Sequence, residues 1–182
     1  MLDDADAVLA AAREGSADAF TAIYDDLAGA VAAYVRAKGV RDVEDVTSEV
    51  FLAVFTGIAG FDGDEAALRS WVFTIAHRRV IDEWRRRGRR PDPVSYEPEH
   101  DARSSRSAEL AALELVGEER ALALLGELTE EQRDVLALRI VADLTVEEVA
   151  VVVGRKPGAV KALQRRGLAS LRRILAKEGV PL

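Results

Sequence analysis

The sequence contains no cysteine and only two histidines, and each shortage excludes a class of site. Without cysteine the chain forms no disulfide and offers no thiolate to a metal. His77 and His100 lie far apart, and no nucleophile–base pattern accompanies either of them. The sequence therefore predicts no enzyme, no metal site and no cofactor.

Long apolar runs are also missing. No stretch approaches the roughly 18 consecutive apolar residues that cross a bilayer. The first residues, MLDDADAVLAAAREG, are acidic and lack the basic segment and apolar core of a secretory signal. We therefore expect a cytoplasmic protein without membrane insertion.

Helix-forming residues are abundant. Ala, Leu, Arg and Glu are common, whereas proline occurs only five times. Hydrophobic residues make up 49% of the chain and charged residues 31%, which is typical of a folded protein rather than a disordered one. Apolar residues recur at helical spacing, and no strand-like alternation of useful length is present. The sequence therefore predicts an all-α fold.

The net charge of −7 conceals a segregation of charge along the chain. Seven arginines lie within 78–90, and Gly154–Lys177 holds eight Lys or Arg residues and no Asp or Glu. The intervening residues 91–128 carry nine acidic and three basic residues. Two basic patches of this kind suggest binding to a polyanion, although either patch alone is equally compatible with a solvated helix surface.

The first 90 residues contain four predicted helices. They are expected at Leu2–Arg13, over 16–39, over 42–58, and over 71–87 with Ser70 as the cap of the last one. The stretch 59–69, which contains two glycines and two aspartates, is predicted as a loop. Its sequence DGDE resembles part of a calcium loop but lacks the later ligands, so it does not predict a metal site.

Helical periodicity stops between Gly88 and Ser107, a segment that holds three of the five prolines. We predict a flexible linker at 91–107, which separates a helical domain at 1–90 from a second helical domain at 108–182. The sequence leaves open whether the two domains pack together.

The second predicted domain contains two capped helix starts and a tight turn. Thr129 precedes Gln132, and Thr145 precedes Glu148, at the spacing of capping residues. The helix expected at 146–153 ends at Gly154, and a longer helix begins near Gly158. The inward residues of that longer helix are Val160, Leu163, Leu168, Leu171 and Leu175.

This pattern is typical of a helix-turn-helix, whose second helix enters the DNA major groove. The outward residues of the second helix are Lys161, Gln164, Arg165 and Arg166, preceded in the turn by Arg155 and Lys156. Lys and Arg pair with guanine and Gln with adenine. An ordinary helical hairpin with a basic surface is the alternative interpretation.

A resemblance to a known family is carried by three segments, VEDVTSEVFLAVF, FDGDEAALRSWVFTIAHRRVIDEWRRRGRR and LTEEQRDVLALRIVADLTVEEVAVVVGRKPGAVKALQRRGLASLRR. In this order they resemble the sigma-70 family of bacterial RNA polymerase initiation factors, especially its small extracytoplasmic-function (ECF) group. The resemblance implies a sigma factor whose partners are core RNA polymerase and promoter DNA, and it implies an anti-sigma factor as inhibitor.

For the first domain, the resemblance implies two binding surfaces. Core polymerase would contact Asp45 and Glu49, with Val46 and Phe51 beside them, although core packing is the alternative for the apolar pair. Capture of the separated −10 strand needs aromatic and cationic groups. The candidates are Trp71, His77, Arg78, Arg79, Arg85, Arg86 and Arg87. Core packing is also the alternative for Trp71, and Arg78 stands where the family commonly has Asn.

For the second domain, the resemblance implies that the helix-turn-helix reads the −35 element, with Arg139 as a phosphate contact. Ala162 and Leu163 replace a hydroxyl and a charged residue of the family pattern, which leaves the base preference open. One other function remains, a stand-alone helix-turn-helix transcription regulator. The arginine-rich end of the first domain favours the sigma factor, because opening a promoter requires such a surface.

Overall fold

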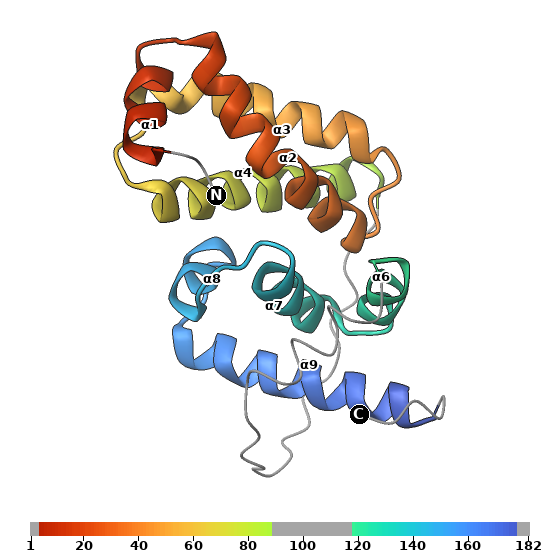
Figure 1. Cartoon of the computed structure of the whole chain (residues 1–182). Helices are drawn as coiled ribbons and strands as arrows, with labels where there is room; N and C mark the ends of the chain where they lie inside the picture. Colours follow the sequence, from red (N-terminus) through yellow and green to blue (C-terminus); the bar gives the residue numbers. More distant parts are fainter. Residues whose placement is uncertain (1–3, 89–117, 178–182) are drawn as a thin grey trace.

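A computed structural model of the chain describes residues 4–88 and 118–177 (Figure 1). Within these ranges all regular structure is helical, which confirms the predicted all-α fold. None of these helices is long and apolar enough to cross a membrane. The predicted linker at 91–107, the start of the predicted second domain and His100 lie outside the described residues.

The first half is a bundle in which each long helix buries one apolar face. Its elements are α1 (Ala5–Arg13), α2 (Ala17–Ala37), α3 (Val43–Gly57), the short 3-10 helix η1 (Ile58–Gly60) and α4 (Glu65–Arg86). The core residues of its long helices include Ile23, Leu27, Val31, Val46, Val50, Val54, Leu68, Val72, Ala76 and Val80.

Helix α4 begins six residues before the predicted position, so Ser70 is not its cap, and the loop predicted over 59–69 is shortened to 61–64. Asp64 is the actual cap, because its Oδ1 accepts a hydrogen bond of 2.8 Å from the backbone N–H of Ala67. The acidic cap and Glu65 in the first turn also complement the helix dipole.

The second half consists of α6 (Glu118–Gly126), α7 (Glu130–Ile140), α8 (Val146–Val152) and α9 (Pro157–Lys177). Thr145 and Glu148 form the predicted capping box at the start of α8. Gly154 ends that helix at φ +65°, a backbone conformation that glycine adopts without strain. All five residues predicted to face inward on α9 are buried, which confirms the helix-turn-helix.

The two halves pack against each other, a point that the sequence left open. Helix α2 contacts α6 and α7, and α4 contacts α8. Figure 1 shows α7 and α8 between α4 and α9, so that α9 lies on the side of the molecule away from the first half.

A buried lysine lies at the contact between the halves. Lys38, at the end of α2, is 1% exposed and forms an ion pair with Asp134 of α7. Its ammonium also lies 4.4 Å from the ring centroid of Trp84 on α4. The ammonium has no hydrogen bond of good geometry to a described group. Burial lowers the pKa of Lys38 below its usual range, and the charge of Arg133 acts in the same direction.

Candidate nucleic-acid interface

The helix-turn-helix presents a cationic outer surface. Lys161 and Arg165 on α9 are exposed, as are Arg155 and Lys156 in the turn before it. The opposite face of α9 packs on α7 and α8 through its buried leucines and Val160. The exposed side of α9 therefore has the position and the charge that a major-groove helix needs.

Two of these cations are paired with carboxylates of neighbouring helices. Arg155 forms an ion pair with Glu131 of α7, and the Nζ atom of Lys161 lies 3.9 Å from Oε1 of Glu147 on α8. All four side chains are well exposed, and such surface pairs contribute only about 0–1 kcal/mol each. DNA phosphates can therefore replace these carboxylates at little cost.

Two of the residues predicted to contact DNA in this half are engaged inside the protein. Gln164 is only 4% exposed, because it lies four residues after Val160 and four before Leu168 on the buried stripe of α9. Arg139 donates a hydrogen bond to the carbonyl of Leu144, and its Nε atom is buried. Arg139 thus holds the segment between α7 and α8, and because it is half-buried its role as a phosphate contact stays a prediction.

In the first half, Trp71 of α4 packs against the segment that precedes this helix. It is half-buried and stacks on Phe61 with a centroid distance of 5.0 Å and an interplanar angle of 25°. A Cβ atom on Gly57 would lie 3.0 Å from the Trp71 ring, so a larger residue there would require the ring to shift by a few tenths of an ångström. Trp71 therefore combines partial core packing with partial exposure.

A residue that the sequence did not reveal fixes this segment. Arg13 at the end of α1 donates hydrogen bonds to the carbonyls of Phe61, at 2.9 Å, and Gly63, at 2.7 Å. Its guanidinium also lies 5.7 Å from the Phe61 ring centroid. The contact spans about 50 positions in the sequence, so no local pattern could have indicated it.

His77, predicted to face DNA, is buried and lies against α2. Its Nδ1 atom is 2.8 Å from the hydroxyl of Tyr34. Burial, assisted by the charge of Lys38, lowers the pKa of His77 to about 4, and burial raises the pKa of Tyr34. Both groups are therefore neutral near pH 7, and we infer that the Tyr34 hydroxyl donates to Nδ1. The prediction of His77 as a DNA contact is corrected by this buried position.

The four residues of α3 that were predicted to contact polymerase differ in their burial. Asp45 is exposed and Glu49 is half-buried, whereas Val46 and Phe51 are buried in the core. The core alternative therefore holds for the apolar pair, which corrects their assignment as polymerase contacts.

The exposed apolar residues of α3 are instead Leu52, 67% exposed, and Phe55, 53% exposed. Both lie off the buried stripe that runs through Val46, Val50 and Val54. The sequence could have indicated these two residues, because an apolar residue that lies off the buried stripe of a helix is a candidate for contact with a partner.

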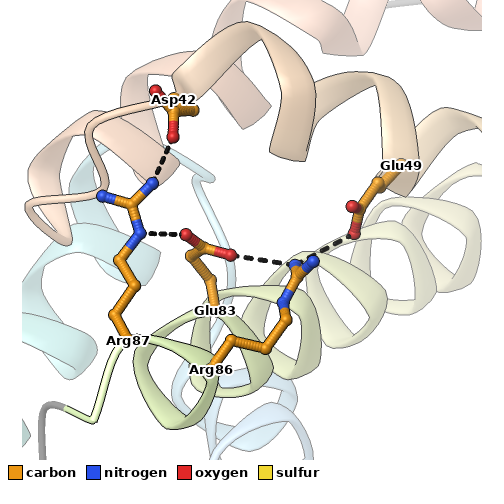
Figure 2. Close-up of polar contacts among 5 residues, drawn as sticks. All are labelled: Asp42, Glu49, Glu83, Arg86 and Arg87. Atoms are coloured by element: carbon orange, nitrogen blue, oxygen red, sulfur yellow. Dashed lines mark hydrogen bonds and ion pairs between the residues drawn. The ribbon is translucent and has the colours of Figure 1, made fainter.

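The arginines at the end of α4 are engaged with carboxylates (Figure 2). Nη2 of Arg86 lies 2.9 Å from Oε2 of Glu83 and 3.5 Å from Oε2 of Glu49. Arg87 contacts Glu83 through Nε and Asp42 through Nη2. We refer to these five residues as the arginine–carboxylate network.

The other candidate arginines of α4 differ in exposure. Arg78 is exposed and Arg79 is half-buried. Arg85 is highly exposed, and its Nη1 atom lies 3.4 Å from Oδ1 of Asp82. The arginines predicted for −10 DNA binding thus lie on or directly after α4, and several of them already form ion pairs with carboxylates of the chain.

Comparison with known protein families identifies both halves. Residues 20–90 match the model of Sigma-70 region 2, and residues 124–173 match the model of Sigma-70, region 4. The two matches cover the helices that carry the candidate surfaces and follow the order of the predicted domains.

Individual proteins are similar over nearly the whole chain. The ECF RNA polymerase sigma factor SigD of Mycobacterium tuberculosis is 33% identical over 92% of this chain and 82% of its own length. The ECF RNA polymerase sigma factor BldN of Streptomyces coelicolor is 32% identical over 90% of this chain, which spans 63% of that relative. Among solved structures, CnrH in complex with the cytosolic domain of CnrY aligns over 96% of this chain and 99% of its own, with a TM-score of 0.69 and 25% identity.

Proposed function

Because the chain belongs to the ECF RNA polymerase sigma factors of the sigma-70 family, we propose that its two halves divide promoter recognition between them. The second half reads the −35 element with α9. The first half docks on core RNA polymerase through α3 and holds the separated −10 strand with α4 and the segment before it.

The observation that carries this proposal is the exposed cationic face of α9 inside a helix-turn-helix. Lys161 and Arg165 lie on the outer side of a helix whose other side is buried, and the turn before it adds Arg155 and Lys156. Groove-reading helices use cationic side chains both for bases and for phosphates. We assign the base contacts to Lys161 and Arg165, and we no longer include Gln164.

For the polymerase surface we propose the exposed side of α3. It presents Asp45 and Glu49 beside the exposed side chains of Leu52 and Phe55. An acidic half followed by an apolar half fits a partner that carries basic side chains next to apolar ones. Exposed aliphatic and aromatic groups supply the desolvated centre of such an interface, and the charges select the partner.

For the −10 element we propose that Trp71 and Phe61 supply aromatic surface to unstacked bases. The stacked pair is half-buried, and Arg13 fixes the backbone beside it. Aromatic surfaces contribute about 1–3 kcal/mol for each stacked base. Arg78, Arg79 and the arginines at the end of α4 would then hold the phosphates.

The test is run-off transcription with purified core RNA polymerase and a library of random promoter sequences. We expect the chain to direct initiation from a subset of templates that share two sequence elements. Initiation identical to that of core polymerase alone would refute the proposal. DNA binding by residues 118–182 without any effect on polymerase would favour the stand-alone regulator, although the match of the first half to Sigma-70 region 2 speaks against that function.

We also propose that an inhibitory protein holds the two halves in the packed arrangement. CnrH, whose structure in complex with CnrY aligns over nearly this whole chain, supports this partner. Since core polymerase supplies the chemistry, the chain would have no catalytic activity of its own and would act in the cytoplasm. An inhibitor of this kind should block run-off transcription when added in equimolar amount.

A further inference from the structure

The short segment that joins η1 to α4 is bound by the end of α1 (Figure 1). Helix α1 contacts both η1 and α4. Its last residue, Arg13, donates from Nε to the carbonyl of Phe61, at 2.9 Å, and from Nη2 to the carbonyl of Gly63, at 2.7 Å. Two donor atoms of one planar guanidinium therefore hold two carbonyls that lie two residues apart.

The same guanidinium lies close to the ring that this segment carries. It is 5.7 Å from the ring centroid of Phe61, which is within the range of a cation–π contact. Phe61 in turn stacks on Trp71 of α4, with centroids 5.0 Å apart and an interplanar angle of 25°. The contacts therefore run from α1 through Phe61 to Trp71, and they end in the aromatic pair proposed above for unstacked bases.

Gly63 also determines where the Phe61 ring lies. A Cβ atom on Gly63 would lie 2.7 Å from Cβ of Ala67 and 2.8 Å from Cζ of Phe61. At these distances a neighbour has to move, and the Phe61 ring is the more mobile of the two, because Ala67 belongs to helix α4. The position of the ring thus depends on both residues, Arg13 and Gly63.

Arg13 differs from the arginines of the arginine–carboxylate network in what it binds. Those arginines face acidic side chains, whereas Arg13 faces neutral carbonyls and a ring. A hydrogen bond from a charged donor is stronger than one between neutral groups. The Arg13 side chain is also half-buried, so salt screens it less than an exposed arginine. Arg13 is therefore better suited to hold the segment than to contact a phosphate.

We propose that Arg13 is a positioning residue for capture of the −10 strand, because it holds residues 61–63 so that Phe61 and Trp71 form one stacked surface before DNA binds. A preformed surface binds more tightly than one that becomes ordered on binding, since ordering opposes association. Arg13 precedes residues 20–90, which match Sigma-70 region 2, so that match assigns it no role. The inference rests on the function proposed above.

The first experiment follows the fluorescence of Trp71 in the isolated full-length chain. The chain has two tryptophans, so the background variant W84F leaves Trp71 as the only one. We expect R13M and G63A to shift the Trp71 emission to longer wavelength, because the ring loses its contact with Phe61 and gains water. An unchanged emission maximum with R13M would show that Arg13 does not hold the aromatic pair and would refute the inference.

The second experiment measures strand binding by the complex of the chain with core polymerase. One fluorescent single-stranded oligonucleotide carries the −10 element of a promoter selected in the run-off experiment, and a second carries the same bases in scrambled order. We expect R13M and G63A to weaken binding of the selected strand about tenfold, because ordering about one backbone residue on binding costs that much. Binding of the scrambled strand should be unchanged. Equal losses for both strands, or no loss for either, would overturn the inference, because Arg13 would then have only a structural role.

Two further variants separate positioning from charge. R41M removes one charge from an exposed side chain of the same half, and no contact of Arg41 with residues 61–63 is recorded in the part of the chain that the structure describes. It should keep the ratio of the two dissociation constants. R13K keeps the charge but has one donor atom in place of the planar guanidinium, so it should stay impaired. Full recovery with R13K, or an equal loss with R41M, would show that charge alone acts and would refute the inference.

Run-off transcription by the unchanged chain separates a failure of the proposed function from a failure of this inference. If no promoter is selected, the proposed function fails and the inference fails with it. If a promoter is selected, the ratio of the two dissociation constants decides the inference alone. Circular dichroism of each variant establishes that the helices are retained.

Discussion

Lys161 is the single residue that tests the recognition helix most directly. It is exposed on α9, and its carboxylate neighbour Glu147 is also exposed. Changing Lys161 to Glu should weaken binding at the upstream element about 5- to 150-fold, because one base contact contributes about 1–3 kcal/mol. The measurement is footprinting of the polymerase complex on a selected promoter.

The control for this prediction is Lys177→Glu, which places the same charge change on the same helix at its far end. That variant should keep the upstream footprint. An unchanged footprint with Lys161→Glu would remove the assignment of α9 as the reading helix.

His77 predicts a pH dependence of stability. Its pKa is lowered to about 4 in the folded chain, against an ordinary value of 6.5. Between these values the unfolded chain binds a proton that the folded chain does not, so this contribution to stability decreases as the pH falls from 7. By pH 5 the loss from this residue should reach about 2 kcal/mol.

The measurement is urea unfolding at pH 7 and pH 5 for the unchanged chain and for His77→Gln. Gln cannot be protonated and retains an acceptor for the Tyr34 hydroxyl. The variant should lose less stability on acidification by the amount given above. The same loss in both proteins would mean that His77 is not buried in its neutral form.

At the scale of elements, the packing of α9 on α7 depends on Gly167. A Cβ atom at this position would lie 2.8 Å from Cδ1 of Leu136 and 3.4 Å from Cβ of Gln132. Gly167→Ala should therefore destabilise the second half by about 1–3 kcal/mol. The higher helix propensity of alanine, worth about 1 kcal/mol, offsets part of that cost.

Gly158→Ala is the matched control, because a Cβ atom there meets nothing within 4 Å on the same helix. Thermal unfolding followed by circular dichroism should show a lower Tm for the Gly167 variant and an equal or higher one for the control. Equal behaviour of the two would mean that α9 does not pack on α7 as closely as the structure shows.

At the scale of the whole molecule, we expect the packed arrangement of the halves to open on a promoter. Elements centred near −10 and −35 are about 25 base pairs apart, or roughly 85 Å of duplex at 3.4 Å per base pair. A compact chain of this length is only about 40 Å across. Contacts between the halves therefore oppose the proposed DNA-bound state.

The ion pair of Lys38 with Asp134 is the contact between the halves that is easiest to test. Asp134→Ala removes the carboxylate that pairs with the buried Lys38, which weakens the contact between the halves. We expect the halves to separate, with a larger radius of gyration in small-angle X-ray scattering and unchanged helix content.

The double variant K38M/D134L provides the comparison. Replacement of a buried ion pair by apolar residues of similar size is often neutral or stabilising, so this protein should stay compact. A compact Asp134→Ala variant, with scattering identical to that of the unchanged chain, would show that other contacts hold the halves together.

The sequence by itself determined the helices, the caps of α7 and α8 and the helix-turn-helix. These features depend on residues three or four positions apart, such as Thr145 with Glu148, and on apolar stripes such as the one through Val160 and Leu168. The prediction failed at the start of α4, because Asp64 was assigned to a loop although it caps this helix. The family could be identified at this level as well, because its motifs occur in order along the chain.

Only the tertiary structure decided which polar residues are available to a partner. The pairing of Lys38 with Asp134, of Arg13 with the carbonyls of residues 61 and 63, and of Arg87 with Asp42 joins positions that are 45 to 96 apart in the sequence. Charge can be counted from the sequence, but its neutralisation depends on which helices pack together. For this reason the basic patches were evident from the beginning, whereas the carboxylates that occupy them were not.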